Sequence, residues 1–283
     1  MMDLRAALAD ATARLAPHSD TPRLDAELLM AHALGITRET LLLNHGQLAP
    51  PPGFATLMDR RMADEPIAYI LGQRDFWSIT LAVGPGVLIP RPDSETLLDA
   101  AVAHAGHSGA PARILDLGTG PGTLLLAALD EWPCARGTGV ERCAIAREYA
   151  ARNTAALGMA DRCRIIAGDW HDAAGLRATL AADGPFDLIL SNPPYVESTA
   201  TLARQVAAYE PGQALFAGVD GLDDYRAIMP TLPALLAPAG IAIIEIGHMQ
   251  GAAVSALAQG AGMTAHRQQD LAGRDRALLC RMA

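Results

Sequence analysis

Between residues 113 and 246, short apolar segments with the length of β-strands alternate with segments of helical periodicity. Strands that are separated by helices of about 10–15 residues are typical of a parallel sheet with helices on both faces. The alternation therefore predicts an α/β fold with a doubly wound, mostly parallel sheet. The predicted strands are residues 113–117, 137–141, 163–167, 186–191 and 239–246.

The segments that flank this alternation predict two hairpins. At the C-terminal end, two strand-like stretches lie on either side of a turn at 270–275, so residues 263–281 predict an antiparallel hairpin that closes the sheet. Ahead of the alternation, residues 76–83 and 87–89 flank Gly84-Pro85-Gly86 and predict another hairpin. Asp93 or Ser94 is expected to cap the helix that follows.

The first 72 residues contain only helical patterns. Apolar residues recur at helical spacing in 2–16 and 22–35, in a short helix from Thr37 to near Gly46, and again from Phe54. No cluster of polar side chains converges in this region, so the sequence predicts a small helical bundle for packing or substrate docking. We expect three parts: a helical domain at 1–72, a β-hairpin linker at 73–92 and the α/β domain at 93–283.

Composition narrows the classes of function. The net charge is −9, so the chain lacks the overall basic character of a nucleic-acid-binding protein. All 22 basic residues are arginines, which excludes a Walker P-loop, a Schiff-base lysine and a lysine general base. The cysteines form no C-x-x-C pair and the histidines no H-E-x-x-H, so no metal site is expected. A signal-peptide core and an apolar run of about 18 residues are both absent, and we expect a cytoplasmic protein without membrane contact.

The strand at 186–191 ends abruptly at Ser191-Asn192-Pro193-Pro194-Tyr195. Two prolines cannot continue a strand, since both lack the backbone N–H, and ligands of an open α/β sheet bind at this carboxyl edge. The Asn192 side-chain carbonyl and the Pro193 backbone carbonyl are acceptors that a stiff turn can direct at a substrate –NH2 group. Tyr195 can lie flat against a planar amide or base. Taken alone, the tetrapeptide is equally compatible with a simple turn.

The strand at 113–117 runs into a glycine-rich loop, Gly118-Thr119-Gly120-Pro121-Gly122. Glycines allow the backbone to turn sharply and to approach a ligand closely. The third glycine comes one residue earlier than in the G-x-G-x-x-G of dinucleotide-binding enzymes, which argues against a nicotinamide dehydrogenase. Asp116 precedes the loop, and its charge favours a cation or an amino group over a pyrophosphate. S-adenosylmethionine carries both of the favoured groups.

Acidic and aromatic side chains follow the next two predicted strands. Glu141 ends the strand at 137–141, where a carboxylate can accept hydrogen bonds from both hydroxyls of a ribose. Asp169 and Trp170 follow the strand at 163–167 and suit an adenine, with Asp169 on its amino group and Trp170 against its ring. Because neighbouring parallel strands end at one edge, these side chains together predict a nucleoside site, although each alone is more often a solvated acid or a core indole.

These residues belong to longer motifs that extend over nearly the whole chain. By these motifs the chain resembles the HemK/PrmC family, the glutamine N5-methyltransferases of peptide-chain release factors. The resemblance implies a class I S-adenosylmethionine-dependent methyltransferase domain with a seven-stranded sheet, and a glutamine in a Gly-Gly-Gln motif of class 1 release factors as the substrate. The motifs are E-P-I-A-Y-I-L-G at 65–72, F-W at 76–77, L-I-P-R-P-D-S-E at 88–95, D-L-G-T-G-P-G at 116–122, S-N-P-P-Y at 191–195, E-P at 210–211 and I-E-I-G at 244–247.

The functional residues of this family are carried over position by position. The resemblance implies that the 118–122 loop, Glu141, Trp170 and Asn192 contact the cofactor, and that residues 192–195 hold the glutamine. The family usually has Asp at position 141 and Ser or Thr at position 121, where this chain has Glu and Pro. We expect both departures to change cofactor affinity more than activity. Acceptors at residues 192 and 193 would orient the amide nitrogen for an in-line displacement that needs no metal and no dedicated base.

Other functions remain open on the sequence alone. An enzyme that methylates an amino group of a flipped adenine or guanine also suits the 192–195 loop, although the acidic net charge argues against stable nucleic-acid binding. A ribosomal-protein glutamine is a further candidate substrate. A non-catalytic cofactor-binding scaffold is a fourth reading, which a methyl-transfer assay would separate from the others.

Overall fold

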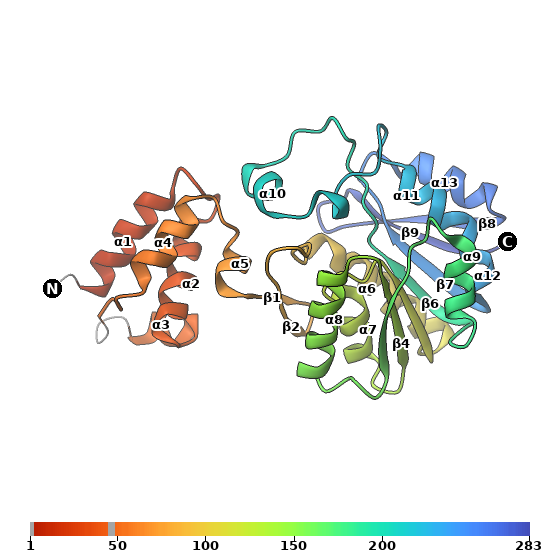
Figure 1. Ribbon diagram of the computed structural model, residues 1–283, viewed down its shortest axis with the longest axis horizontal. Helices are drawn as coiled ribbons and strands as arrows, with labels where there is room; N and C mark the ends of the chain where they lie inside the picture. Colours follow the sequence, from red (N-terminus) through yellow and green to blue (C-terminus); the bar gives the residue numbers. More distant parts are fainter. Residues whose placement is uncertain (1–2, 45–48) are drawn as a thin grey trace. The chain divides into compact units, whose positions relative to one another are not determined.

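The computed structural model describes residues 3–44 and 49–283 of the chain (Figure 1). The chain divides into two compact units. The first consists of Met1–Gln73 together with Leu202–Tyr209, and the second of Arg74–Thr201 together with Glu210–Ala283.

The first unit is a helical bundle. Pro22 occupies the first turn of the second helix, and Gly35 ends that helix in the left-handed conformation at φ 67°, as the sequence predicts. The predicted end of the third helix near Gly46 lies outside the described residues. The Tyr209 hydroxyl donates to the Ala63 carbonyl at 2.8 Å and ties the last helix to the bundle. The helices are α1 (Leu4–Leu15), α2 (Pro22–Leu34), α3 (Arg38–Asn44), α4 (Phe54–Met62), α5 (Ile67–Leu71) and α10 (Arg204–Tyr209).

The second unit is built on a seven-stranded sheet with the order β5-β4-β3-β6-β7-β9-β8. The first five strands of that order are parallel, and β9 pairs antiparallel with both β7 and β8. This confirms the predicted sheet and its closing hairpin. The strands are β3 (Arg113–Leu117), β4 (Arg136–Glu141), β5 (Cys163–Ala167), β6 (Phe186–Ser191), β7 (Leu236–Glu245), β8 (Met263–Gln269) and β9 (Asp275–Met282).

Helices cover both faces of this sheet. In Figure 1, α6, α7 and α8 lie on one face, and α9, α11, α12 and α13 lie on the other. Strand residues Leu115, Leu117 and Ile189 share a buried apolar cluster with this second group of helices. The helices are α6 (Glu95–Ser108), α7 (Thr123–Glu131), α8 (Ala144–Ala156), α9 (Ala173–Leu180), α11 (Asp223–Ile228), α12 (Leu232–Leu235) and α13 (Gly251–Gly260), with short 3-10 turns η1 (Pro92–Ser94), η2 (Gly212–Ala214) and η3 (Met229–Thr231).

The structure contains a β-hairpin ahead of the large sheet, as predicted, but the predicted bounds of its two strands are wrong. It pairs β1 (Gln73–Phe76) with β2 (Ile79–Ala82), so the turn falls at Trp77 and not at Gly84-Pro85-Gly86. Trp77 adopts φ 54°, and its N–H donates to Glu95 Oε1 at 3.0 Å. Residues 87–89 form no strand, because the Ile89 N–H donates to the buried Glu210 carboxylate at 3.1 Å. Hydrogen bonds from backbone N–H groups to acids that are distant in the sequence therefore determine the conformation of this region.

Candidate active site

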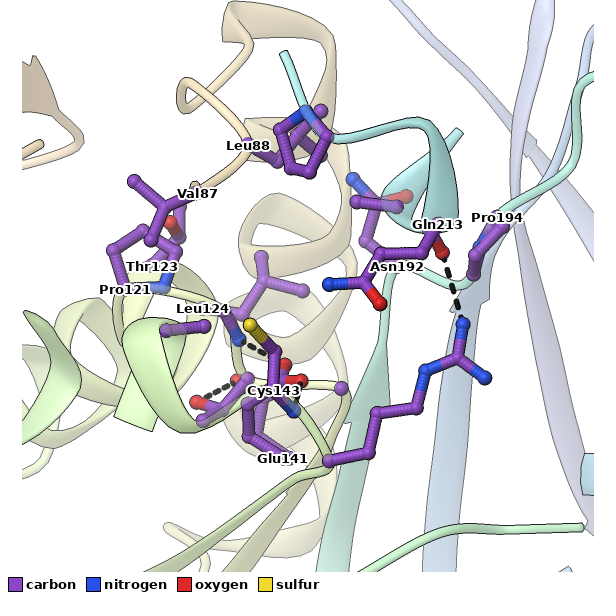
Figure 2. Close-up of a pocket in the computed structure, with 18 of the residues that line it drawn as sticks. Val87, Leu88, Pro121, Thr123, Leu124, Glu141, Cys143, Asn192, Pro194 and Gln213 are labelled. Atoms are coloured by element: carbon purple, nitrogen blue, oxygen red, sulfur yellow. Dashed lines mark hydrogen bonds between the residues drawn. The ribbon is translucent and has the colours of Figure 1, made fainter. Parts of the chain in front are cut away.

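A pocket lies at the carboxyl edge of the sheet, where the loops after β3, β4, β5 and β6 meet. The strand order reverses between β3 and β6: the chain runs from β3 outward to β5 and then returns to place β6 on the other side of β3. Open α/β sheets bind their ligands at such a reversal. Figure 2 shows Pro121, Thr123 and Leu124 on one side of the pocket and Asn192, Pro194 and Gln213 on the other.

The glycine-rich loop is shaped by two requirements on Gly118. Its φ is 75°, and a Cβ at this position would lie 2.8 Å from the ring of Trp170, so no larger residue fits. The Gly118 and Thr119 N–H groups both donate to the Val140 carbonyl, at 2.9 and 3.0 Å. Gly120, at φ 56°, has open space where a Cβ would stand. The loop therefore exposes its backbone to the pocket at Gly120.

Glu141 joins this loop to the next one. Its Oε2 accepts from the Gly120 N–H at 3.0 Å, and its Oε1 accepts from the Cys143 N–H at 2.7 Å. The side chain is half-buried in the pocket wall. Each carboxylate oxygen has a second lone pair, so Glu141 can still accept hydrogen bonds from a ligand.

Asp116 is a buried acid in the same wall. Its Oδ2 accepts from the Thr119 hydroxyl at 2.7 Å and from the Leu125 N–H at 3.3 Å. Its Oδ1 is buried and has no hydrogen-bond partner among the described residues. Burial raises the pKa of the Asp116 carboxyl to about 7. An unpartnered carboxylate oxygen in a pocket wall favours a ligand with a positive charge or a hydrogen-bond donor.

Asp169 and Trp170 form the wall beyond β5. The Trp170 Nε1–H donates to Asp224 Oδ1 at 2.7 Å, and His171 Nε2 lies 3.1 Å from the same oxygen. The indole is only 8% exposed, so this bond fixes the ring where it meets the pocket. Asp169 Oδ1 accepts from the His171 N–H at 2.9 Å.

The loop after β6 is fixed at both ends. The Ser191 hydroxyl donates to the Leu117 carbonyl at 2.7 Å and joins the ends of β6 and β3. Asn192 Nδ2 donates to Ser94 Oγ at 3.1 Å, and the Tyr195 hydroxyl donates to Glu245 Oε1 at 3.2 Å. Asn192 thus enters the pocket wall with its amide nitrogen already engaged.

Glu245 ends β7 and is fully buried, as is Ser94. The Ser94 hydroxyl donates to Glu245 Oε2 at 2.5 Å. Of the two predicted caps, Asp93 and Ser94, it is Ser94 that stands at the N-cap position of α6, but its side chain makes no capping bond there. Asp93 instead pairs with Arg276 at 2.9 Å. Burial raises the pKa of the Glu245 carboxyl to about 7. The Ser94 hydroxyl gives its proton to the Glu245 carboxyl and its oxygen accepts from Asn192 Nδ2, so these two partners hold the side chain in place of the helix N–H groups.

Hydrogen bonds of polar side chains hold the remaining walls of the pocket. Glu210 accepts from the Ile89 N–H and from the Arg91 guanidinium, and the Arg142 guanidinium donates to the Gln213 carbonyl at 3.1 Å, which Figure 2 shows as a dashed line. The buried Asn153 joins the hairpin to the glycine loop: it bonds the N–H and carbonyl of Ala82 at 2.8 and 3.1 Å and donates to the Pro121 carbonyl at 2.8 Å.

The structure brings most of the predicted site residues together. Gly122, Pro193 and Tyr195 are outside the pocket wall, and Tyr195 turns its hydroxyl to Glu245. Sequence reasoning missed Ser94, Glu245, Asn153 and Glu210 as site residues. Glu245 carries a recognisable signal, since it is an acid within an apolar strand. The predicted residues that line the pocket are Gly118, Thr119, Gly120, Pro121, Glu141, Asp169, Trp170, Asn192 and Pro194.

Within residues 3–44 and 49–283, no three His, Cys, Asp or Glu side chains are grouped so that they could hold a metal ion. None of the described helices has the length and apolar character needed to cross a membrane.

Family models match both parts of the chain. Residues 6–72 match the PrmC N-terminal domain, and residues 109–268 match a methyltransferase domain. Release factor glutamine methyltransferases are similar to this chain over nearly its whole length. The one from Rhodospirillum rubrum is 42% identical and is aligned over 93% of this chain and 79% of its own. The one from Vibrio cholerae is 38% identical over 98% of this chain and 96% of its own.

A solved structure supports the fold. The T. thermophilus 16S rRNA methyltransferase in complex with AdoMet and guanosine superposes with a TM-score of 0.54 at 19% identity. The match covers 75% of this chain and 50% of that one. At this identity the likeness concerns the sheet and its helices alone.

Proposed function

The chain belongs to the family of release factor glutamine methyltransferases, and we propose that it methylates the side-chain amide nitrogen (N5) of a glutamine in the Gly-Gly-Gln motif of class 1 peptide-chain release factors. The observation that carries this proposal is Asn192. Its amide nitrogen is bound by Ser94, so its carbonyl oxygen is the part left to meet a substrate –NH2 group. The enzyme would act in the cytoplasm, where release factors work.

We propose S-adenosylmethionine as the methyl donor, and the pocket residues fit it. When bound, it supplies an electrophilic methyl group on a positively charged sulfur. The unpartnered Asp116 Oδ1 suits its positive charge and donors, and Glu141 suits the two ribose hydroxyls. Asp169 would accept from the adenine amino group while Trp170 borders the ring. The Gly120 backbone leaves room for a close approach.

The chain's contribution to methyl transfer is orientation. The nitrogen of a glutamine amide is a poor nucleophile, since its lone pair is delocalised into the carbonyl. Hydrogen bonds from its two N–H groups to Asn192 Oδ1 and the Pro193 carbonyl would turn that lone pair toward the methyl group. These bonds strengthen as positive charge develops on the nitrogen, so they stabilise the transition state more than the ground state. No side chain is needed as a general base, because an N-protonated amide is a strong acid.

Two roles are considered for Tyr195: holding the 192–195 loop in place and contacting the glutamine amide. Its hydroxyl donates to Glu245, and it packs against the buried core of the sheet. Direct contact between its ring and the glutamine amide stays a prediction. We assign Tyr195 first to holding the 192–195 loop.

Mass spectrometry of a purified release factor after incubation with the enzyme and S-adenosylmethionine tests the proposal. One added methyl group on the glutamine of Gly-Gly-Gln is expected. Asn192→Ala should lower kcat by about 10²–10³, because a preorganised acceptor is lost, and should leave the cofactor dissociation constant nearly unchanged. Methylation of adenine or guanine with an unmodified release factor would instead assign the site to a nucleobase methyltransferase.

A further inference from the structure

Asn192 is the last member of a hydrogen-bond chain that starts outside the pocket. Glu245 accepts from the Ser94 hydroxyl at 2.5 Å, and Ser94 Oγ accepts from Asn192 Nδ2 at 3.1 Å. We propose that Glu245 and Ser94 are positioning residues that decide which end of the Asn192 amide faces the substrate. This inference rests on the role proposed above for Asn192.

The direction of each bond follows from the number of protons. The pKa of the Glu245 carboxyl is about 7, so above that pH Glu245 is a carboxylate that only accepts, and the single hydroxyl proton of Ser94 is committed to it. Ser94 Oγ then offers Asn192 only lone pairs, and the Asn192 carbonyl oxygen would be repelled from it. The Nδ2 group therefore faces Ser94, and Oδ1 is turned away from Ser94 and left to accept from the glutamine –NH2. The chain of bonds thus imposes one of the two amide orientations, which have nearly the same shape.

Burial makes this constraint effective. Glu245 and Ser94 are 1% and 2% exposed, so water cannot replace either partner. The Tyr195 hydroxyl occupies the other Glu245 oxygen at 3.2 Å, and the Tyr225 hydroxyl donates to the Glu245 main-chain carbonyl at 2.9 Å. With both ends held by other elements, the carboxylate presents Oε2 to Ser94 in a fixed place.

The charge of Glu245 determines the outcome. The charged groups that act on it are Arg276 on β9, which favours the carboxylate, and Asp93, which opposes it. A protonated Glu245 could donate to Ser94 and release the Ser94 proton toward Asn192. The Asn192 amide would then turn over and present its own –NH2 to the –NH2 of the substrate. Two donors would face one another, and the substrate amide would lose an acceptor.

The test compares single and double variants of the full-length enzyme with an intact release factor and saturating S-adenosylmethionine. Ser94→Ala removes the bond and should lower kcat by about 10- to 100-fold, as expected for a misplaced reacting group. Ser94→Thr keeps the hydroxyl and should recover most of that loss. In the Asn192→Ala background, Ser94→Ala should have almost no further effect, because residues that act as one unit are not additive.

Two measurements separate orientation from a general structural effect. The Asn192 side-chain amide signal in ¹⁵N NMR, identified by its absence in Asn192→Ala, should be protected from solvent exchange in the wild type and in Ser94→Thr but not in Ser94→Ala. Calorimetry should show that Ser94→Ala changes the cofactor dissociation constant by less than about threefold. Thermal unfolding measures separately the stability that is lost with the Ser94 bonds to Glu245 and Asn192.

The outcomes distinguish this inference from the proposed function. Wild-type turnover in Asn192→Ala would overturn the proposed role of Asn192. A low turnover in Asn192→Ala with unchanged turnover in Ser94→Ala would overturn the positioning role alone. An equal fractional loss from Ser94→Ala in both backgrounds would also overturn it, since Ser94 would then act independently of Asn192.

Discussion

At the scale of the residue, Glu141 has two tasks in one carboxylate. It joins Gly120 to Cys143 through their N–H groups and, by our proposal, accepts from the cofactor ribose. Glu141→Ala should therefore weaken S-adenosylmethionine binding by about 10- to 100-fold, equivalent to losing charge-assisted bonds of roughly 1.5–3 kcal/mol. Calorimetry measures this change. Glu148→Ala, on the exposed face of α8, is the matched control. An unchanged dissociation constant would leave Glu141 with the loop-holding task alone.

Asp116 predicts a pH dependence of stability. Burial raises its pKa to about 7 in the folded protein, above the value expected in the unfolded chain. Proton binding therefore favours the folded state: this contribution is fully present below the unfolded pKa and is lost as the pH rises through about 7. The apoprotein should lose stability between pH 5.5 and pH 8 for this reason, and the raised pKa of Glu245 acts in the same direction.

Asp116→Asn removes the charge and should reduce that loss. Near pH 8 the variant should be more stable than the wild type by about 1–3 kcal/mol, since a buried charge with an unpartnered oxygen is no longer present. Its affinity for S-adenosylmethionine should fall at the same time. Thermal unfolding at the two pH values and calorimetry are the measurements, with Asp99→Asn, at an exposed position of α6, as the control. A variant that is equally destabilised at both pH values would contradict the assignment.

What the sequence reveals at this scale depends on distance along the chain. Glu141, Asp169 and Asn192 were predictable because each lies at or within two residues of the end of a strand, and parallel strands bring their ends to one edge. Ser94 was taken for a helix cap because its partner, Glu245, lies 151 residues away. Helix-capping rules consider only residues near the helix end, so they do not include a buried side chain that reaches Ser94 from a distant strand or loop.

At the scale of the element, the sheet was predictable and the hairpin only in part. Short apolar runs between helical segments mark the buried parallel strands, and β3, β5 and β6 have the bounds that the sequence predicts. In the hairpin, a Gly-Pro-Gly sequence is the stronger local turn signal, yet the turn falls at Trp77. The Trp77 N–H bonds Glu95, and the Ser78 hydroxyl bonds Asp130 at 2.6 Å. Bonds to α6 and α7 therefore outweigh the local preference.

Asn153 provides the test of how the hairpin is held. Asn153→Ala would leave the Ala82 N–H, the Ala82 carbonyl and the Pro121 carbonyl without this partner. The bond to the Pro121 carbonyl is buried and the two bonds to Ala82 are partly buried, and a buried group left unpaired costs about 1–3 kcal/mol, so the variant should lose about that much stability or somewhat more. Because Pro121 belongs to the glycine loop, cofactor affinity should fall as well. Denaturant unfolding and calorimetry check both effects, and the exposed Asn44→Ala is the control. Loss of stability with unchanged cofactor affinity would separate the hairpin from the site.

At the scale of the whole molecule, the compact units are not continuous in the sequence. The predicted parts are consecutive, at 1–72, 73–92 and 93–283, whereas the first compact unit also contains Leu202–Tyr209. Tyr209 and Ala63 are 146 residues apart in the sequence, so no local pattern predicts the hydrogen bond between them. The hairpin belongs to the second unit from Arg74 onward. The docking task of residues 1–72 stays a prediction, and it has consequences for substrate choice.

If residues 1–72 dock the release factor, the enzyme should discriminate strongly between an intact factor and a short peptide. A Gly-Gly-Gln peptide supplies the reacting atoms, but it loses conformational entropy on ordering and offers little surface to the enzyme. With the full-length enzyme, kcat/KM for the intact factor should exceed that for the peptide by about 100-fold or more, corresponding to roughly 2.7 kcal/mol of binding at a distance from the tip.

A competitor that cannot be methylated shows whether this binding energy comes from contacts away from the Gly-Gly-Gln tip. A release factor whose Gly-Gly-Gln glutamine is replaced by alanine cannot accept the methyl group, but it keeps every surface away from the tip. It should inhibit methylation of the normal factor with an inhibition constant close to the KM of that factor, whereas a Gly-Gly-Ala peptide should not inhibit at the same concentration. Steady-state kinetics measure both constants. Equal efficiency on peptide and protein, or no inhibition by the altered factor, would place all recognition at the pocket and remove the docking role, because binding energy that lies away from the reacting atoms does not depend on the glutamine.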